Sequence, residues 1–134
     1  MRRRFIRNDS GAAMVEFALV VPVLLLIVWG IVDISRAFQT IDNLTSAVRE
    51  GARVGAVMSS APNQGPNQTQ IQNTVASAFQ PIGAPLNPSS VTVAWDGTQV
   101  TVSASYPFQS LTPLLWAITI SRTAVFRWEP STAP

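Results

Sequence analysis

Apolar residues dominate the first quarter of this sequence. No charged residue lies in 17–32, and the longer segment 12–34 is interrupted only by Glu16 and Asp33. As a helix of 23 residues at 1.5 Å per residue, this segment would be roughly 34 Å long, enough to cross a hydrocarbon core of roughly 30 Å. The pattern therefore predicts a membrane-spanning helix over residues 12–34.

The helical period continues beyond the apolar run. Apolar or small residues recur at steps of three, four and seven, which is typical of one face of an amphipathic helix: Ile34, Phe38, Ile41, Val48, Ala52 and Gly55. Two oppositely charged pairs at i,i+3 spacing lie on other faces: Asp33 with Arg36, and Glu50 with Arg53. Since no proline interrupts residues 23–60, we expect one helix from about residue 11 to residue 58, with its second half outside the membrane.

Two glycines near the end of this helix, Gly51 and Gly55, have the G-x-x-x-G spacing that lets two backbones approach closely. In a membrane helix this motif indicates pairing between helices, but here it lies outside the apolar segment. We therefore favour packing of the chain's own sheet against these small residues.

A shorter amphipathic helix is predicted over Gln70–Gln80, with Thr69 as its N-cap and Pro81 after its end. The polar residues 59–70 before it form a surface loop. Residues 111–116 are predicted to form a loop between two strands of a sheet.

A β-hairpin is predicted around Asp96-Gly97, because alternating runs flank a dipeptide that favours a two-residue type I′ turn. That turn implies cross-strand pairs of Trp95 with Thr98, Val93 with Val100, Val91 with Val102, and Thr92 with Thr101. The second strand is expected to end at Pro107, and Thr119–Trp128 alternates as a third antiparallel strand. The predicted fold class is α+β: a long N-terminal helix, membrane-spanning in its first half, packed by a short helix and a small antiparallel three-stranded sheet.

The charges are distributed unevenly. Of nine basic residues, all arginine, four lie in residues 1–11 against one acid, a local balance of +3; the rest holds five arginines against six acids, a balance of −1. Basic residues directly before an apolar run indicate a cytoplasmic N-terminus rather than nucleic-acid binding. A cleaved secretory signal fits less well, because the apolar run is too long and no A-x-A site follows. An ordinary signal anchor and a signal cut before the apolar run share this topology.

Catalytic motifs are missing from the sequence. It contains no histidine and no cysteine, which excludes Cys/His zinc sites, cysteine nucleophiles and the commonest general base. On the long helix, Asp33, Asp42 and Glu50 follow one another at steps of nine and eight residues, too far apart for a catalytic pair. We expect a non-catalytic protein with no metal and no cofactor.

The segment SGAAMVEFAL resembles a class III prepilin processing site, with Gly11, then Ala12, then Glu16 five positions after the glycine. The wider sequence resembles TadE-like minor pseudopilins of the tight-adherence (Flp) pilus system. The resemblance is most specific over residues 10–56. It is also carried by AVREGARVGAV at residues 47–57, and by VTVSASYPF and SRTAVFRWE later in the chain.

This resemblance implies that a prepilin peptidase cuts between Gly11 and Ala12 and releases residues 1–11 as a leader. Glu16 would then form a salt bridge with the new ammonium of Ala12, in the same chain or a neighbour. Residues 35–134 would form an extracytoplasmic α+β domain of a single-pass protein of the bacterial inner membrane. Its expected partners are the peptidase, other pilin or pseudopilin subunits with the assembly machinery, and the lipid bilayer, but no nucleic acid. The alternative is a signal-anchored extracytoplasmic binding domain unrelated to pili; a secreted soluble protein ranks third.

Overall fold

A computed structural model describes residues 9–58, 65–112 and 117–129. Within them the elements follow in the order α1 (Asp9–Val57), α2 (Gln68–Ala78), a 3-10 turn (Pro88–Ser90), β1 (Val91–Trp95), β2 (Gln99–Phe108) and β3 (Ile118–Arg127). This confirms the predicted α+β fold class. Most of the expected leader, part of the polar loop 59–70 and most of the loop 111–116 lie outside the described residues.

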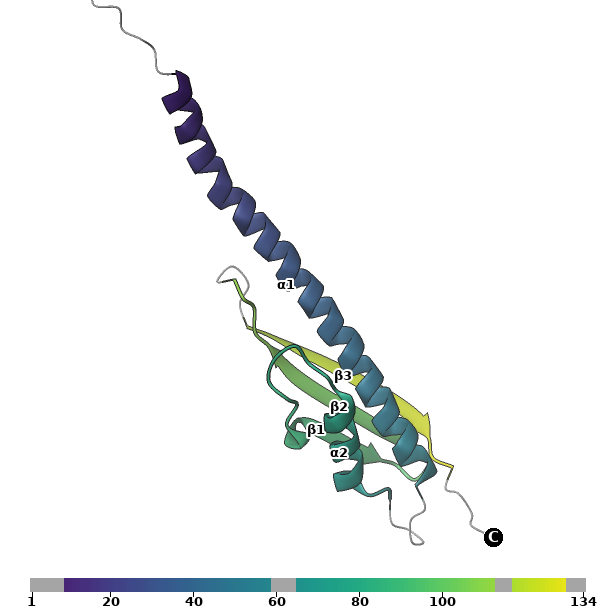
Figure 1. The fold of residues 1–134 in the computed structure, drawn as a ribbon. Helices are drawn as coiled ribbons and strands as arrows, with labels where there is room; N and C mark the ends of the chain where they lie inside the picture. The colour runs from purple at the N-terminus through teal and green to yellow at the C-terminus, as the bar shows by residue number, and fades with distance from the viewer. Residues whose placement is uncertain (1–8, 59–64, 113–116, 130–134) are drawn as a thin grey trace, which may run out of the picture.

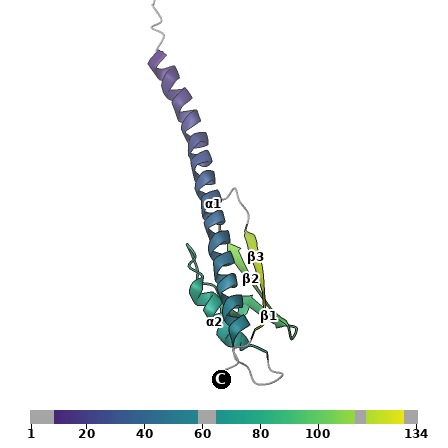
Figure 2. The ribbon, with the colours of Figure 1, turned by 90° about the vertical axis from the view of Figure 1, so that its right-hand side faces the viewer.

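Helix α1 is continuous from the apolar segment to the folded domain, as the uninterrupted period predicts. Figures 1 and 2 show its N-terminal half standing alone and its C-terminal half lying along the rest of the fold. Pro22 lies inside the helix without ending it. Asp33 is the first buried residue of α1, so the domain begins to cover the helix there.

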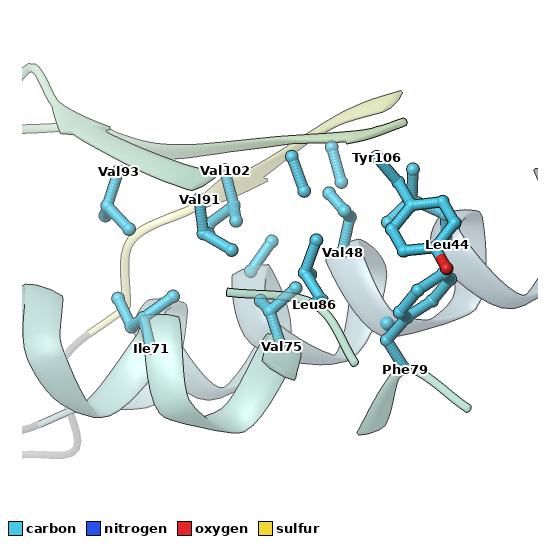
Figure 3. Packing of buried hydrophobic residues seen from close by; sticks show 14 of the residues in the cluster. Leu44, Val48, Ile71, Val75, Phe79, Leu86, Val91, Val93, Val102 and Tyr106 are labelled. Carbon is cyan, nitrogen blue, oxygen red and sulfur yellow. The ribbon is translucent and has the colours of Figure 1, made fainter. Parts of the chain in front are cut away.

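The domain has two layers. The antiparallel sheet, in the order β1-β2-β3, forms one layer, and α2 with the second half of α1 covers a single face of it (Figure 2). Figure 3 shows valines of the sheet meeting side chains of both helices between the layers. The largest fully buried apolar side chains in this core are Leu44, Val48, Ile71, Val75, Val91, Val100 and Val102. The other sheet face is mainly small and polar, with a Ser103–Thr123 hydroxyl contact of 2.9 Å.

Helix α2 exists as predicted but begins and ends two residues earlier. Its N-cap is Asn67 rather than Thr69, because the Asn67 side chain accepts a hydrogen bond from the Gln70 amide at 3.2 Å. Asparagine is at least as good a cap as threonine, and the helix starts at the better one. Phe79 therefore leaves the helix as its C-cap and packs edge-on against Tyr106 in the core, with ring centroids 4.9 Å apart.

The predicted register of the hairpin is wrong by two residues. Trp95 pairs with Val100, Val93 with Val102, Val91 with Ala104 and Thr92 with Ser103. The Asp96 carboxylate accepts hydrogen bonds from the amides of Thr98 (2.8 Å) and Gln99 (2.6 Å), which moves the tip of the turn to Gly97-Thr98. Gly97, at this tip, takes a φ of +93°. The hydrogen bonds donated by the Thr98 and Gln99 amides hold the pKa of the Asp96 carboxyl below its ordinary value of 3.8. A shift of two leaves each side chain on its predicted face.

Strand β2 continues through Pro107 to Phe108, whereas the sequence predicted its end at Pro107. Pairing with β1 stops at Ala104, so Pro107 lies where β2 has only β3 beside it, opposite Thr119. A proline is tolerated at such an edge position because no second ladder needs its missing N–H. The third strand is confirmed, one residue earlier than predicted at each end.

The two glycines near the end of α1 serve packing within the chain. A Cβ added to Gly51 would overlap Cγ2 of Val75, and one added to Gly55 would lie 2.7 Å from Cδ1 of Ile71 and 3.1 Å from Cγ1 of Val100. Packing within the chain is therefore confirmed, but the expected contact with the sheet is found only at Gly55, because Gly51 faces helix α2 alone.

We expect Gly51→Ala to destabilise the domain, although alanine favours helix by about 1 kcal/mol over glycine. Overpacking costs about 1–3 kcal/mol, and the branched Val75 side chain has little freedom to move away. A net loss of about 1 kcal/mol would lower the midpoint of thermal unfolding by about 4–8 °C, measured by near-ultraviolet circular dichroism in detergent. Gly30→Ala is the matched control, because its new Cβ meets nothing within 4 Å. An unchanged midpoint for Gly51→Ala would contradict the close approach.

Candidate functional site

The three residues predicted for processing lie in the first two turns of α1. Gly11, Ala12 and Glu16 are all exposed, and a Cβ added to Gly11 would meet nothing within 4 Å. Ala12 and Glu16 are four residues apart on one helix and therefore share a face. Helical side chains tilt toward the N-terminus, so Glu16 extends along the helix in the direction of Ala12.

The Gly11–Ala12 peptide bond lies within the first turn of α1, which begins at Asp9. The first four N–H groups of a helix have no partner within it, and a glycine lowers helix stability by about 1 kcal/mol relative to alanine. This bond is therefore in the part of α1 that unwinds most readily, and its surroundings leave it open to another protein.

A second carboxylate in the apolar segment, Asp33, has quite different surroundings. It is fully buried, and its two oxygens accept hydrogen bonds from the Leu111 amide (2.9 Å), the Thr112 amide (2.9 Å) and the Thr112 hydroxyl (2.7 Å). The predicted pairing with Arg36 is also present, at 3.2 Å. The contacts of Asp33 with Leu111 and Thr112 were not predicted. These residues are separated from Asp33 by 78 and 79 positions in the sequence, and no local pattern relates residues so far apart.

Arg36 extends this contact to a second segment. Its guanidinium donates to the Ile82 carbonyl at 3.4 Å and lies 5.5 Å from the centre of the Phe108 ring. Asp33 therefore holds the segment after β2, and Arg36 holds the segment after α2, against α1. Both contacts lie where the N-terminal half of the helix, which no other described segment covers, begins.

A depression of about 290 Å³ opens beside Arg36, between the segment after α2 and the end of β2. Of the described residues that line it, Arg36 is the only charged one; the others include residues 82–87, Tyr106 and Phe108. The Tyr106 hydroxyl already donates to the Ala84 carbonyl at 2.9 Å. Among the described residues, the lining contains no carboxylate, and its hydroxyl groups are those of Ser90, Tyr106 and Ser110.

The opposite end of the domain carries an exposed ion pair and two tryptophans. Glu50 and Arg53 form the predicted pair at 2.7 Å. The hydrogen bonds that Arg53 donates to the Glu50 carboxylate lower the pKa of Glu50 below its ordinary value of 4.5 and raise the pKa of Arg53. Trp95 and Trp128 pack edge to face, 5.3 Å apart, and neither indole N–H has an acceptor in the structure. Both rings are partly exposed, so we regard the pair as the border of the core.

Metal-binding clusters are likewise not found: among the residues that the structure describes, no three Asp, Glu, His or Cys side chains are grouped to hold an ion. The structure thus presents two candidate functional features. One is the exposed Gly11–Ala12 peptide bond, with the Glu16 carboxylate nearby, at the N-terminal end of α1. The other is the buried Asp33 carboxylate, which holds the domain to the middle of α1.

We expect Asp33→Asn to release residues 111 and 112 from α1. Asparagine replaces one acceptor oxygen by an NH₂ group, which would face a donor, and removes the charge that strengthens the remaining bonds. Hydrogen exchange of the Leu111 and Thr112 amides should accelerate by about tenfold or more, measured by NMR in micelles. Asp42→Asn, on an exposed part of α1, is the control. Unchanged protection at both amides would show that the carboxylate does not hold this segment.

Comparisons with known proteins bear on the N-terminal region. The family model described as TadE-like protein matches residues 11–53, a match that begins at Gly11 and ends within the second half of α1. No curated protein and no solved structure matches the chain significantly. Within the described residues, α1 is the one helix long and apolar enough to cross a membrane. The resemblance noted in the sequence is thereby confirmed: residues 11–53 match the TadE-like proteins, a family associated with the tight-adherence pilus.

Proposed function

We propose that this protein is a non-catalytic, pilin-like (pseudopilin) component that takes part in assembling a tight-adherence type IV pilus. The observation that carries the proposal is the order of features in one segment: arginines, then Gly11, then Glu16, then an apolar helix, within a TadE-like match that starts at Gly11. An ordinary membrane anchor needs the arginines and the apolar helix, but neither Gly11 nor Glu16.

Processing is the first step of the proposal. A prepilin peptidase of the inner membrane would hydrolyse the Gly11–Ala12 bond, releasing residues 1–11. The position of this bond in the first turn of α1, with no side chain packed over it, supports access by a protease. The four arginines of the leader would hold it on the cytoplasmic side of the membrane.

Glu16 would link assembly to processing, because its carboxylate could pair with an ammonium that exists only after cleavage. Cleavage would leave an ammonium on Ala12, one helical turn before the Glu16 carboxylate. A charged side chain at mid-span costs roughly 2.5–3.5 kcal/mol and less near the interface, and an ammonium beside it would recover part of that cost. Pairing with the ammonium of a neighbouring subunit would favour lateral packing of two α1 helices. No residue in the described structure forms an ion pair with Glu16, so it is available for this role.

The remaining parts of the proposal concern location. Residues 12–34 would cross the inner membrane, and residues 35–134 would lie on its outer side, so that the bilayer and other pilin-like subunits are the immediate partners. Apolar side chains are exposed along the whole first half of α1. This supports a membrane crossing, because a water-soluble protein rarely leaves so large an apolar surface uncovered.

Processing is tested by co-expression with a prepilin peptidase and intact-mass measurement of the purified chain. We expect a mass lacking residues 1–11, and a strong loss of cleavage in Gly11→Ala, because its added methyl group would occupy the peptidase's glycine subsite. Gly30→Ala should be cleaved normally, since both changes meet open space in the fold. An uncut chain, or one cut after the apolar helix, would refute processing at Gly11.

Assembly is tested with Glu16→Gln, which keeps the shape of the side chain but removes its charge. We expect membrane insertion to be unchanged and crosslinking to other pilin-like subunits, or pilus formation, to fall by about tenfold or more if a pair worth over 1.4 kcal/mol is lost. Asp42→Asn serves as the charge-matched control on the same helix. If Glu16→Gln assembles normally, the alternative of a signal-anchored binding domain becomes the better interpretation.

A further inference from the structure

Two chain segments meet α1 at the point where its solitary half begins. One follows α2 and contains Ile82, whose carbonyl accepts from Arg36; the other follows β2 and contains Leu111, whose amide donates to Asp33. We call these residues, 82–85 and 109–112, the span-proximal loops. These two hydrogen bonds place both loops at the level of residues 33–36 on the helix axis.

Each span-proximal loop exposes a large apolar side chain. Ile82 is 55% exposed and Leu111 is 59% exposed, although the backbone of each is held by a side chain of α1. Neighbouring apolar residues are exposed as well: Ile34 and Phe38 on α1, and Ile118 at the start of β3. Exposed apolar residues of this size gathered around one end of a domain indicate a surface that contacts something other than water.

Charge is missing from the same end of the domain. Residues 80–90 and 106–121 contain no Asp, Glu, Lys or Arg, and the two charges that α1 brings there, Asp33 and Arg36, are paired with each other. The other charged residues of the domain lie farther along α1, in the turn after β1, or in and just after β3: Asp42, Arg49, Glu50, Arg53, Asp96, Arg122, Arg127 and Glu129. A surface with apolar side chains and no free charge fits the border of a bilayer.

The length of α1 sets the height of this surface. Residues 12–32 form 21 helical residues, roughly 31 Å, which matches a hydrocarbon core of roughly 30 Å. Residues 33–36 then lie within about 5 Å of the hydrocarbon boundary, inside a headgroup layer that is about 5–7 Å thick on each side. Whatever is fastened to Asp33 and Arg36 is carried into the same layer.

We propose that the span-proximal loops rest in the outer leaflet, with the side chains of Ile82 and Leu111 inserted among the lipids, so that the domain is seated on the bilayer. This inference rests on the proposed crossing of the membrane by the first half of α1. Hydrogen bonds from Leu111, Thr112 and Arg36 let the Asp33 carboxylate lie at the lipid border without water. The same bonds fix the depth of the loops, because they tie the loop backbone to one position on α1.

Single-cysteine variants test this arrangement, since the chain has no cysteine of its own. Nitroxide labels at Ile82→Cys and Leu111→Cys would be measured in full-length protein in vesicles of phosphatidylethanolamine and phosphatidylglycerol. Power-saturation EPR then compares collisions with oxygen, which concentrates in lipid, and with a water-soluble nickel chelate. Val125→Cys is the matched control, an equally exposed apolar position on the outer face of the sheet. Leu25→Cys reports whether the apolar half of α1 is in lipid.

We expect oxygen-to-nickel ratios at positions 82 and 111 to be several-fold higher than at 125 and lower than at 25. Ratios at 82 and 111 equal to that at 125, with position 25 in lipid, would overturn the seating while leaving the membrane span intact. A water-exposed label at position 25 would overturn both. Protection at 82 and 111 that rises with the protein-to-lipid ratio would instead assign this surface to contacts between subunits and would also refute the proposal.

Discussion

The structure depends on the attachment of Asp33 to the segment after β2. At this residue α1 changes from a helix that no other described segment covers to the central support of a folded domain. A carboxylate is costly to bury without partners, and here four donors satisfy its two oxygens. The attachment therefore defines both where the domain ends and how it is oriented on the helix.

The two carboxylates of the apolar segment illustrate two ways of placing charge near lipid. Asp33 is satisfied within the chain, by backbone amides, a hydroxyl and Arg36. Glu16 has no such contacts and lies exposed in the second turn of α1. An internal set of donors makes Asp33 a structural residue, whereas the open surroundings of Glu16 suit a contact formed with another chain or with a terminus created by cleavage.

Much of the fold follows from periodicity. The long helix, the short helix, the three strands and the inward faces of the sheet were predicted because apolar residues recur at the spacing of each element. The processing residues Gly11, Ala12 and Glu16 come from a local motif and stay a prediction. The hairpin register was not predicted, because the Asp96 side chain competes for the turn amides and moves its tip by one residue. The Asp33 contacts were not predicted either, because they join residues nearly eighty positions apart whose meeting depends on the packed sheet.

The packing of α1 also explains how one helix can hold a domain directly beside its own apolar half without a linker. Gly51 and Gly55 admit α2 to close contact at the far end, and Asp33 with Arg36 fastens the loops at the near end. Between them, the core side chains of α1 lie along the sheet (Figure 3). A helix fixed at both ends of its contact has little freedom to rotate or slide against the domain. Any tilt of the apolar half of α1 is therefore passed directly to the sheet. In the proposed assembly, contacts between neighbouring subunits at the first turns of the helix would orient the domain as well.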